Sequence, residues 1–514
     1  MVLIGTLWLT LAVFLFKTNA ELPEVHLNNE ADFVDPQGRI LLFHGFNSVY
    51  KQPPYFNEKD VSDTRLNFFQ QWGFNVVRLG VLWHAAFPLG PGDPNDTYLK
   101  AIEWQVDRFA NAGIYVILDM HQDSLSTMFG SYNAIPLWLL KEFPKPPWIF
   151  KYPWPRRKLP SGDWEGYTTY ACQMAFQHIY NNQSNAWNHW GNFWIEVANR
   201  FRNRSNVLGY ELMNEPFAGN IYTNPLRAIP GYAGKHNLAP VYDHLVGRIR
   251  SVDKKKLIFF EGVTWSVLAA SNNDGFAGPG FEHVPGGSAD PQEFQRSVFS
   301  YHYYCPLLEL ANGSLNFPFY KRLICDEASP IPGILMPRMF SSVKGIARGL
   351  KSGRFLTEFG ICAPDGNPDS INTIECNAVM NGADAHLQSW AYWDARFFDE
   401  QENPLINQVE SFARVYPMMT GGVPIILTFD VKNGSAFYAF STTSLTMDLA
   451  RNEEPIASIF VPIQMHYQHG YELEVNPASI WYNVSPHNSN LFYLYASSGE
   501  LNEGTIIEVN INAQ

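Results

Sequence analysis

Eight short apolar runs, separated by helical patterns, constrain the fold of this chain more than any other feature. Most of the runs are nearly continuous in apolar residues, as strands covered on both faces are. They lie at residues 40–46, 75–79, 115–120, 207–213, 256–261, 298–303, 354–357 and 389–393. Helical periodicity falls between them, at residues 61–72, 99–111, 186–202 and 241–251. This alternation predicts an α/β fold, a (β/α)8 TIM barrel with insertions.

A doubly wound sheet is the alternative arrangement of alternating strands and helices. Sheets of that kind that bind nucleotides carry a glycine-rich phosphate loop directly after the first strand. Residues 47–51, which follow the first run, read Asn-Ser-Val-Tyr-Lys and contain no glycine. The barrel is therefore the preferred prediction.

The pattern changes near residue 420, where short β-branched and aromatic runs alternate with turn signals such as Asn433-Gly434. The runs lie at residues 425–429, 436–440, 457–461, 491–495 and 505–511. They predict a C-terminal antiparallel β-sandwich domain. We expect a leader at 1–20, a catalytic barrel at 21–415 and the sandwich at 416–514. The sandwich either binds sugar or lipid or serves as a structural cover on the barrel.

Two barrel runs end near a glutamate. Glu215 follows Asn214 after the fourth run, and Glu358 follows Thr357 at the end of the seventh. The carboxyl ends of barrel strands form the face on which barrel enzymes carry their active sites. Retaining cleavage of a glycosidic bond requires two carboxyl groups, a proton donor and a nucleophile. Either glutamate alone is also compatible with a strand cap or a structural ion pair.

Other strand-end residues extend this pattern. They are Arg78, His121, Asn214, His302, Tyr304 and a tryptophan in the eighth run. In this order the set resembles the signature of the clan of (β/α)8 glycosidases that includes glycoside hydrolase family 5. The resemblance covers about residues 38–400. It implies a retaining glycoside hydrolase.

Within this clan the chain resembles the endoglycoceramidases. The resemblance rests on residues 45–48 (Gly-Phe-Asn-Ser) with Lys51, on residues 119–123 (Asp-Met-His-Gln-Asp), and on the C-terminal β domain. It implies hydrolysis of the β-glycosidic bond between oligosaccharide and ceramide in a glycosphingolipid, either a ganglioside or a neutral glycosylceramide. A covalent glycosyl-enzyme is the expected intermediate.

Physical chemistry predicts roles for the central residues. Glu215 must be protonated to donate to the leaving ceramide oxygen, and it then acts as base toward water. Glu358 must be ionised to attack the anomeric carbon. Arg78 and Tyr304 are expected to hold Glu358 by hydrogen bonds, with Arg78 keeping it ionised. Asn214 is expected to bond the sugar 2-hydroxyl, and retention predicts carboxyl groups about 5–5.5 Å apart.

A further set of residues is expected to read the sugar hydroxyls. It comprises Lys51, Asp119, His121, Asp123 and His302, beside Asn214 and Tyr304. A lone strand-end histidine is usually a satisfied core group, but two aspartates flank His121. Trp393 is the predicted stacking platform under the sugar. Trp390 faces the other side of the same strand and is predicted to be core.

Composition and charge narrow the class of partner. The chain is 15% aromatic, which suits stacking against the apolar faces of sugar rings. Its net charge is −13, and no extended basic tract could follow a phosphate backbone, so we expect no nucleic-acid partner. Two-carboxyl hydrolysis uses no metal or organic cofactor, and we predict none.

The N-terminus predicts export. Residues 3–16 are apolar, and Thr18 and Ala20 stand at the −3 and −1 positions of a cut after Ala20. No basic residue precedes the apolar stretch, and a retained anchor is the alternative. Six Asn-x-Ser/Thr sequons agree with a secreted protein or one in the lumen of a digestive or lysosomal compartment. They lie at Asn95, Asn182, Asn203, Asn312, Asn433 and Asn483.

Five cysteines are too scattered for a zinc site and too few for a disulfide scaffold. In an oxidising compartment we expect two local bridges, Cys305–Cys325 and Cys362–Cys376. Cys172 would stay free. Sequence alone does not fix this connectivity.

An insertion after the third run is rich in proline, aromatic residues and cations. Residues 141–158 contain six basic residues and one acidic residue, although the whole chain is acidic. Aromatic and cationic side chains on a proline-rich loop suit a lipid–water interface. We expect transient contact with a membrane or micelle, and a lid packed on the barrel is the alternative.

Two other functions fit parts of the pattern. A cellulase-like or exo-β-glucanase-like hydrolase of the same family would use the same two glutamates on a β-glucan. A glycolipid enzyme needs an apolar groove on the leaving-group side, which residues 135–140 could supply. A non-catalytic carbohydrate-binding protein on a barrel would need no proton donor paired with a nucleophile.

Overall fold

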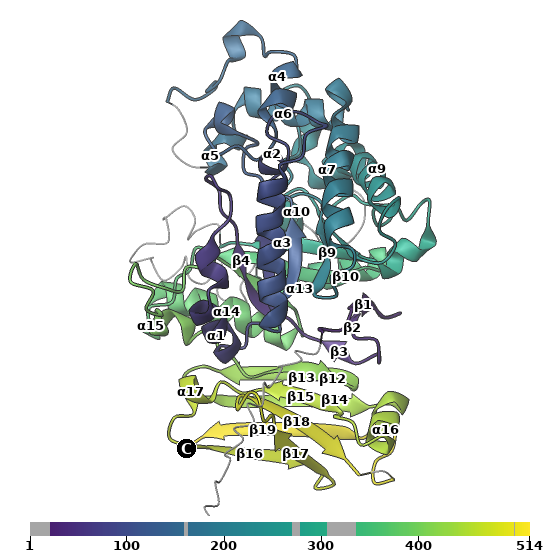
Figure 1. Cartoon of the computed structure of the whole chain (residues 1–514), viewed down its shortest axis with the longest axis vertical. Coiled ribbons are helices and arrows are strands. Elements are labelled where there is room, and N and C mark those ends of the chain that lie inside the picture. Colours follow the sequence, from purple (N-terminus) through teal and green to yellow (C-terminus); the bar gives the residue numbers. More distant parts are fainter. Residues whose placement is uncertain (1–20, 159–162, 270–277, 306–335, 498) are drawn as a thin grey trace, which may run out of the picture.

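Eight parallel strands pair in chain order and close into a barrel (Figure 1). The structure, a computed structural model, describes residues 21–158, 163–269, 278–305, 336–497 and 499–514. The barrel strands are β4 (His44–Ser48), β5 (Val76–Gly80), β6 (Tyr115–Asp119), β7 (Val207–Glu211), β8 (Leu257–Glu261), β9 (Ser297–Tyr303), β10 (Gly353–Gly360) and β11 (Trp390–Trp393). All but two of their residues are buried, as expected for strands covered on both faces. The predicted barrel is confirmed.

Helices connect the barrel strands, and one more short helix follows the last of these strands. They are α1 (Asp63–Gln71), α2 (Trp83–Ala86), α3 (Asp96–Asn111), α4 (Leu137–Glu142), α5 (Asp163–Tyr167), α6 (Tyr170–Tyr180), α7 (Ala186–Phe201), α8 (Pro230–Ala233), α9 (Ala239–Arg250), α10 (Ser266–Ala269), α13 (Met336–Leu350), α14 (Ile371–Ala385) and α15 (Ile406–Val409). Local signals set their starts: the Asn95 side chain accepts from the Tyr98 backbone N–H and caps α3. A helix long and apolar enough to cross a membrane does not occur among the described residues.

The C-terminal domain is built from two antiparallel sheets, which confirms the predicted sandwich. Its strands are β12 (Tyr416–Thr420), β13 (Gly422–Asp430), β14 (Ser435–Thr442), β15 (Ala457–Phe460), β16 (Tyr471–Asn476), β17 (Ile480–Val484), β18 (Leu491–Ala496) and β19 (Ile506–Ala513), with helices α16 (Ser444–Arg451) and α17 (Ile463–His466). The sequence patterns predicted neither β12, β16 nor β17. β17 is an edge strand with four exposed residues in a row, so it has no alternating pattern to detect.

The first predicted run, residues 40–46, is wrong as a single strand. Residues Ile40–Leu41 form β3, which pairs with β2 (Phe33–Val34) and with β12, while the barrel strand β4 begins only at His44. β1 (His26–Leu27) pairs with β2, so three short N-terminal strands extend a sheet of the C-terminal domain. Leu42 packs in the core of that domain and Phe43 in the barrel. A continuous apolar run conceals this division because both neighbours are buried.

Buried polar contacts join the two domains. The Arg414 guanidinium lies 2.7 Å from the Asp384 carboxylate at the end of α14 and donates to the Phe429 carbonyl of β13 at 3.2 Å. The Tyr416 hydroxyl donates to the Gly73 carbonyl at 2.6 Å. Figure 1 shows the sandwich at one end of the barrel, in contact with its helices. The two domains therefore share an ordered interface.

The predicted bridge between Cys362 and Cys376 is present. It links the segment after β10 to α14. Cys172 is a buried free cysteine, as predicted. The other predicted bridge, Cys305–Cys325, involves Cys325, which lies outside the described residues.

Candidate active site

The two glutamates meet at the carboxyl ends of the barrel strands. Glu358 lies inside β10, where the pairing with β9 skips one residue: Leu356 is opposite Tyr301, and Glu358 is opposite His302. Thr357 is thus the extra residue of a β-bulge. Bulges re-aim side chains and are frequent beside active sites. Here the bulge brings Glu358 level with His302 on the neighbouring strand.

Glu215 lies four residues beyond the end of β7. Its φ is +41°, a left-handed conformation that is uncommon for a residue with a side chain. Its side chain reaches His302, with Oε1 of Glu215 2.9 Å from Nδ1 of His302. The same His302 nitrogen lies 3.5 Å from Oε2 of Glu358. His302 therefore sits between the two carboxyl groups.

The separation of the two carboxyl groups indicates the stereochemistry. An oxygen of Glu215 and an oxygen of Glu358 lie within 4.8 Å of each other. Inverting glycosidases separate their carboxyl groups by about 6.5–9.5 Å to admit a water, whereas retaining enzymes keep them about 5–5.5 Å apart. The observed distance fits direct attack by one carboxylate and retention.

Arg78 is the electrostatic centre of the site. It is fully buried and donates to Glu358 at 2.5 Å, to Asn214 at 2.8 Å and to Glu211. Its guanidinium also lies 3.2 Å from Asp119. The Tyr304 hydroxyl donates to the other oxygen of Glu358 at 2.7 Å. Both contacts expected of Glu358 are therefore present, and several carboxylates share one cation.

Burial dominates the protonation of both glutamates. It raises the pKa of Glu215 to about 8, and the nearby Asp123 carboxylate adds to the rise. Burial also raises the pKa of Glu358, while the Arg78 cation opposes that rise. Arg78 thus favours the ionised nucleophile, as expected, but does not outweigh burial. Because Glu215 has its pKa near 8, it is protonated below that pH, as a general acid must be.

His302 is neutral and His121 is positively charged, because different groups surround the two rings. Burial lowers the pKa of His302 to about 4, so it is neutral beside Glu215. Burial also opposes protonation of His121, but Asp119 and Asp123 outweigh it and raise its pKa to about 9. His121 contacts Asp119 at 2.6 Å and Asp123 at 3.5 Å. It is a cation held between two carboxylates.

Lys51 extends this row of charged side chains toward solvent. Its ammonium lies 2.7 Å from Asp123, which also accepts from the Tyr132 hydroxyl at 3.0 Å. The side chain of Lys51 is 27% exposed, more than those of Asp123, His121 and Asp119. Asp119 is instead fully buried against Arg78 and His121. Asp119 thus supports His121 directly, and its contact with sugar hydroxyls stays a prediction.

Trp393 forms one wall of the site. Its ring stacks on His121 at 5.2 Å, and the Lys51 ammonium lies 5.0 Å from its centre. Trp393 is partly exposed, so a sugar can reach its ring. Its role as a stacking platform stays a prediction. Trp390 is fully buried, as predicted for a core residue.

Four buried residues near the glutamates were not predicted. They are Asn47, Gln122, Glu211 and Glu261. Glu261 ends β8, so the rule that selected Glu358, a glutamate at the end of a buried strand, also applied to it. Asn47 and Gln122 bond mainly to backbone carbonyls and to Arg78, a role that carries no sequence signal.

Two overlapping groups in the described chain bring carboxyl oxygens and a histidine nitrogen within 4.8 Å of one another. One group is Glu211, Glu261 and His302, and the other is Glu215, His302 and Glu358. Arg78 already supplies a positive charge to Glu211 and Glu358. The arrangement suits proton transfer, and we assign no metal to it.

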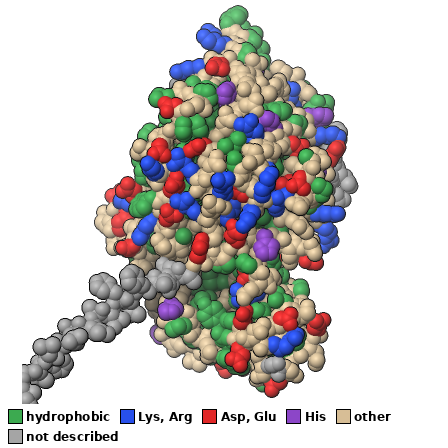
Figure 2. Space-filling view, turned by 45° about the vertical axis from the view of Figure 1, so that its right-hand side comes forward, with side chains coloured by type: hydrophobic (Ala, Val, Ile, Leu, Met, Phe, Trp, Pro, Cys, Tyr) green, Lys and Arg blue, Asp and Glu red, His purple; other side chains and the backbone are tan. Residues whose placement is uncertain are grey.

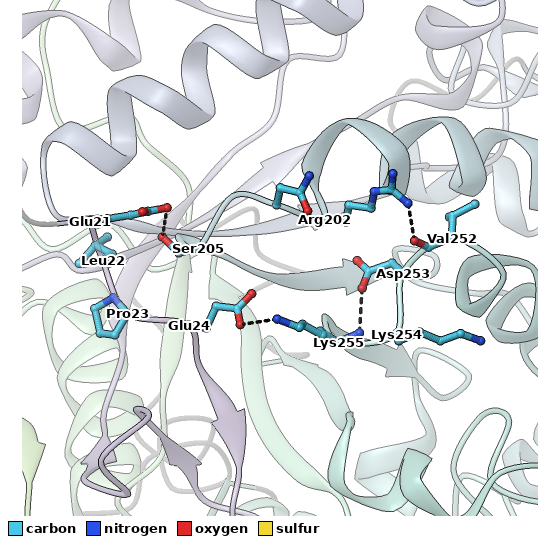
Figure 3. A pocket seen from close by; sticks show the side chains of 11 residues that line it. Glu21, Leu22, Pro23, Glu24, Arg202, Ser205, Val252, Asp253, Lys254 and Lys255 are labelled. Carbon is cyan, nitrogen blue, oxygen red and sulfur yellow. Dashed lines mark hydrogen bonds and ion pairs between the residues drawn. The ribbon is translucent and has the colours of Figure 1, made fainter.

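A cleft opens at the carboxyl ends of β4 and β11. Lys51, Trp393, Asp394 and Arg396 contribute to its lining. A second cleft lies at the opposite end of the barrel, where residues 202–205 and 252–255 precede β7 and β8 (Figure 3). There Glu24 pairs with Lys255 at 3.3 Å, and Ser205 donates to Glu21 at 3.1 Å. This second cleft anchors the N-terminal segment far from the catalytic groups.

The insertion after β6 separates into an anchored part and a projecting part. Phe150 stacks on Tyr170 with ring centres 4.7 Å apart, and Trp154 packs against Tyr222 at 5.2 Å. Trp148 is 80% exposed and Ile149 49% exposed. Residues 143–158, the tip segment, lie at the end of the molecule farthest from the sandwich (Figure 1), and apolar and basic side chains meet at that end (Figure 2).

Burial limits the apolar groove that residues 135–140 could supply on the leaving-group side. Ile135, Leu139 and Leu140 are buried in the barrel core, and the Trp138 indole N–H donates to the Phe87 carbonyl. An apolar run on α4 faces the interior because that face covers the barrel. Tyr222, in the loop after β7, offers open aromatic surface, since it is 42% exposed.

Family comparisons agree with this geometry. Residues 34–399 match the model of the cellulase family, glycosyl hydrolase family 5. Residues 414–511 match the glycoside hydrolase family 5 C-terminal domain.

Individual relatives and solved structures point the same way. An endoglycoceramidase of Cyanea nozakii is 33% identical over 479 residues, covering 86% of this chain and 85% of that protein. An endoglycoceramidase of Hydra vulgaris is 31% identical over 501 residues, covering 92% and 86%. The structure of endo-glycoceramidase II from Rhodococcus sp. with ganglioside GM3 has a TM-score of 0.71 at 19% identity and covers 93% and 98% of the two chains.

Proposed function

The chain belongs to glycoside hydrolase family 5, and we propose that it hydrolyses the β-glycosidic bond between the oligosaccharide and the ceramide of glycosphingolipids. The observation that carries the catalytic part is the pair of buried glutamates with oxygens within 4.8 Å, one of them with a pKa of about 8. The substrate class is supported by the endoglycoceramidases of Cyanea nozakii and Hydra vulgaris, which align over most of both chains.

The geometry supports a two-step reaction. Glu358, held by Arg78 and Tyr304, attacks the anomeric carbon while protonated Glu215 gives its proton to the leaving ceramide oxygen. Glu215 then takes a proton from water, which attacks the glycosyl-enzyme and frees the sugar with retained configuration. Neutral His302 can accept a hydrogen bond from protonated Glu215, and its other tautomer can donate one to the ionised carboxylate. It can therefore bond to Glu215 in both protonation states.

The oligosaccharide is expected in the cleft beside β4 and β11. Lys51 and Trp393 line it, and Asp123 and His121 lie directly behind Lys51. The ceramide is expected on the opposite side, nearer Glu215. Tyr222 and Trp154 form an aromatic surface there that continues into the tip segment.

Incubation of the protein with a purified ganglioside in detergent, followed by mass spectrometry, tests the substrate. Intact oligosaccharide and free ceramide are the expected products. Stepwise loss of terminal sugars, or activity only on a β-glucan, would keep the two glutamates but reject the glycolipid. Glu358→Gln should abolish cleavage and retain binding, which separates an enzyme from a binding protein.

We also propose that the tip segment makes the transient contact with the membrane or micelle that holds the substrate. Trp148 and Ile149 project into solvent, although exposed apolar side chains gain free energy by leaving water. Lys145, Lys151 and Arg157 are exposed around them and complement anionic headgroups. Trp154 and Phe150 pack on the barrel and hold the base of the segment. In this proposal the packed base of the insertion corresponds to the predicted lid. Its projecting part corresponds to the predicted docking loop.

Trp148→Ser tests the contact. We expect about a tenfold loss of ganglioside cleavage in anionic vesicles, since a buried tryptophan contributes on the order of 1.5–3 kcal/mol. Cleavage of a short soluble glycoside should stay unchanged. Trp104→Ser, at a 43% exposed position on α3, is the matched control. Equal losses on vesicles and on the soluble glycoside would reject membrane contact by Trp148.

We propose further that the chain is exported and glycosylated, either secreted or delivered to a digestive lumen. Asn182, Asn203, Asn433 and Asn483 are exposed sequons, Asn95 is partly buried as the cap of α3, and Asn312 lies outside the described residues. Expression in a eukaryotic host, with N-terminal sequencing and glycosidase treatment, tests this. Glu21 as the first residue and a mass shift on deglycosylation are expected. An unprocessed, unglycosylated chain in the cytosol would contradict it.

A further inference from the structure

Glu261 is a buried carboxyl group that the two-glutamate reaction does not use. It is the last residue of β8 and is 3% exposed. Its Oε2 accepts the backbone N–H of Glu215 at 2.7 Å. This acceptor stands on β8, the strand adjacent to β7, which leads to the acid/base.

Glu215 needs such support because its backbone is strained. A left-handed φ of +41° is unfavourable for a residue with a side chain and persists only where the surroundings enforce it. The Gln122 side-chain amide donates to the backbone carbonyl oxygens of Asn214, at 2.7 Å, and of Glu215, at 3.1 Å. Glu261 and Gln122 therefore hold both sides of this residue.

Glu261 also stands behind the side-chain partner of Glu215. Its Oε2 is 3.9 Å from Nε2 of His302, and Nδ1 of the same ring contacts Glu215 at 2.9 Å. The Glu261 carboxyl group thus contacts the backbone of Glu215 and also lies behind the histidine that contacts the Glu215 side chain. A shift of Glu261 would disturb both.

Resting on the proposed function, we propose that Glu261 is a positioning residue for the acid/base: its carboxyl oxygen holds the strained Glu215 backbone so that the Glu215 carboxyl points at the leaving oxygen. The group acts as a hydrogen-bond acceptor and not as a charge. A misplacement of a catalytic group by about 1 Å can lower a rate on the order of 100-fold, so the effect of losing the acceptor is large.

The surroundings explain why the charge is dispensable. Glu215 and Glu211 on the β7 side, Arg78 on β5 and His302 on β9 face the Glu261 carboxyl, and the Tyr242 hydroxyl donates to its backbone carbonyl. Burial raises the pKa of Glu261 well above its usual range, and the two neighbouring glutamates add to the rise while Arg78 opposes it. A neutral glutamine in its place presents the same carbonyl oxygen.

Two variants test the role, with kcat/KM measured for the glycolipid and for a dinitrophenyl glycoside. Glu261→Leu removes the acceptor, and we expect about a 100-fold loss on the glycolipid, whose leaving alkoxide must be protonated. The loss on the dinitrophenyl glycoside should stay within about fivefold, because its leaving group departs without an acid. Glu261→Gln should keep glycolipid activity within about fivefold of the wild type, with its alkaline limb unmoved.

Other outcomes overturn the proposal. Equal losses of Glu261→Leu on both substrates would show a general structural role, as would no loss on either. A Glu261→Gln enzyme as slow as Glu261→Leu, or an alkaline limb moved to lower pH, would show that the carboxylate charge matters. If the Leu variant does not fold, the Gln profile alone decides. A wild type that cleaves the dinitrophenyl glycoside but no glycolipid would instead reject the proposed substrate.

Discussion

Single residues at this site are defined by what surrounds them more than by their type. Glu215 and Glu358 are both buried strand-end glutamates, but only Glu358 touches the Arg78 guanidinium. Glu215 instead contacts the neutral His302, and the nearby Asp123 carboxylate raises its pKa. Two identical side chains thus receive different roles, acid and nucleophile, from their neighbours.

This asymmetry predicts the pH dependence. For a soluble alkyl glycoside, whose leaving group needs a proton, we expect a bell-shaped profile of kcat/KM. Activity should fall as pH rises through about 8, because Glu215 then loses the proton that it must donate. It should also fall as pH drops through the pKa of Glu358, which burial places above the usual value of about 4.3. Stopped assays across the pH range measure both limbs. An alkaline limb that Glu215→Gln leaves in place would contradict this assignment.

At the scale of elements, β10 does more than carry a catalytic side chain. The bulge at Thr357 changes the register between Leu356 and Glu358, and Asn47 on β4 donates to the Thr357 carbonyl at 2.9 Å. Just past the strand, the disulfide Cys362–Cys376 fastens the chain to α14. Strand, bulge and bridge together fix where the nucleophile stands.

The bridge is expected to contribute stability that a double variant removes. Replacing Cys362 and Cys376 by serine should lower the free energy of unfolding by about 3 kcal/mol, because a loop of this length restricts the unfolded chain by that amount. Denaturant unfolding of the variant and of the wild type, each with and without reductant, measures it. Identical midpoints for all four samples would contradict the expectation.

At the scale of the whole molecule, the barrel and the sandwich are built from interleaved segments. The N-terminal strands β1, β2 and β3 belong to a sheet whose other strands lie after residue 415. The Arg414–Phe429 and Tyr416–Gly73 hydrogen bonds cross the junction. The sandwich is therefore an integral cover of the barrel.

Truncation tests this integration. A chain ending at residue 415 leaves β3 without β12 and exposes Leu42, which packs in the sandwich core. We expect such a chain to be poorly soluble and inactive, whereas the full chain should unfold in one calorimetric transition. Circular dichroism, activity and calorimetry are the measurements. A soluble, active barrel without the sandwich would show that the domains are separable.

Local patterns in the sequence predicted the barrel, the sandwich and the two glutamates, because buried strands and strand-end carboxyl groups are visible along the chain. β1, β2 and β17 are short segments without periodicity and gave no such pattern, and β3 was hidden in the run that also contains β4. The sequence could not show that Asp119 supports His121 from a buried position, that Glu261 and Gln122 hold Glu215, or that Trp148 projects while Trp154 packs. Those outcomes depend on which distant side chains share a space, and burial, charge and backbone strain act through that space.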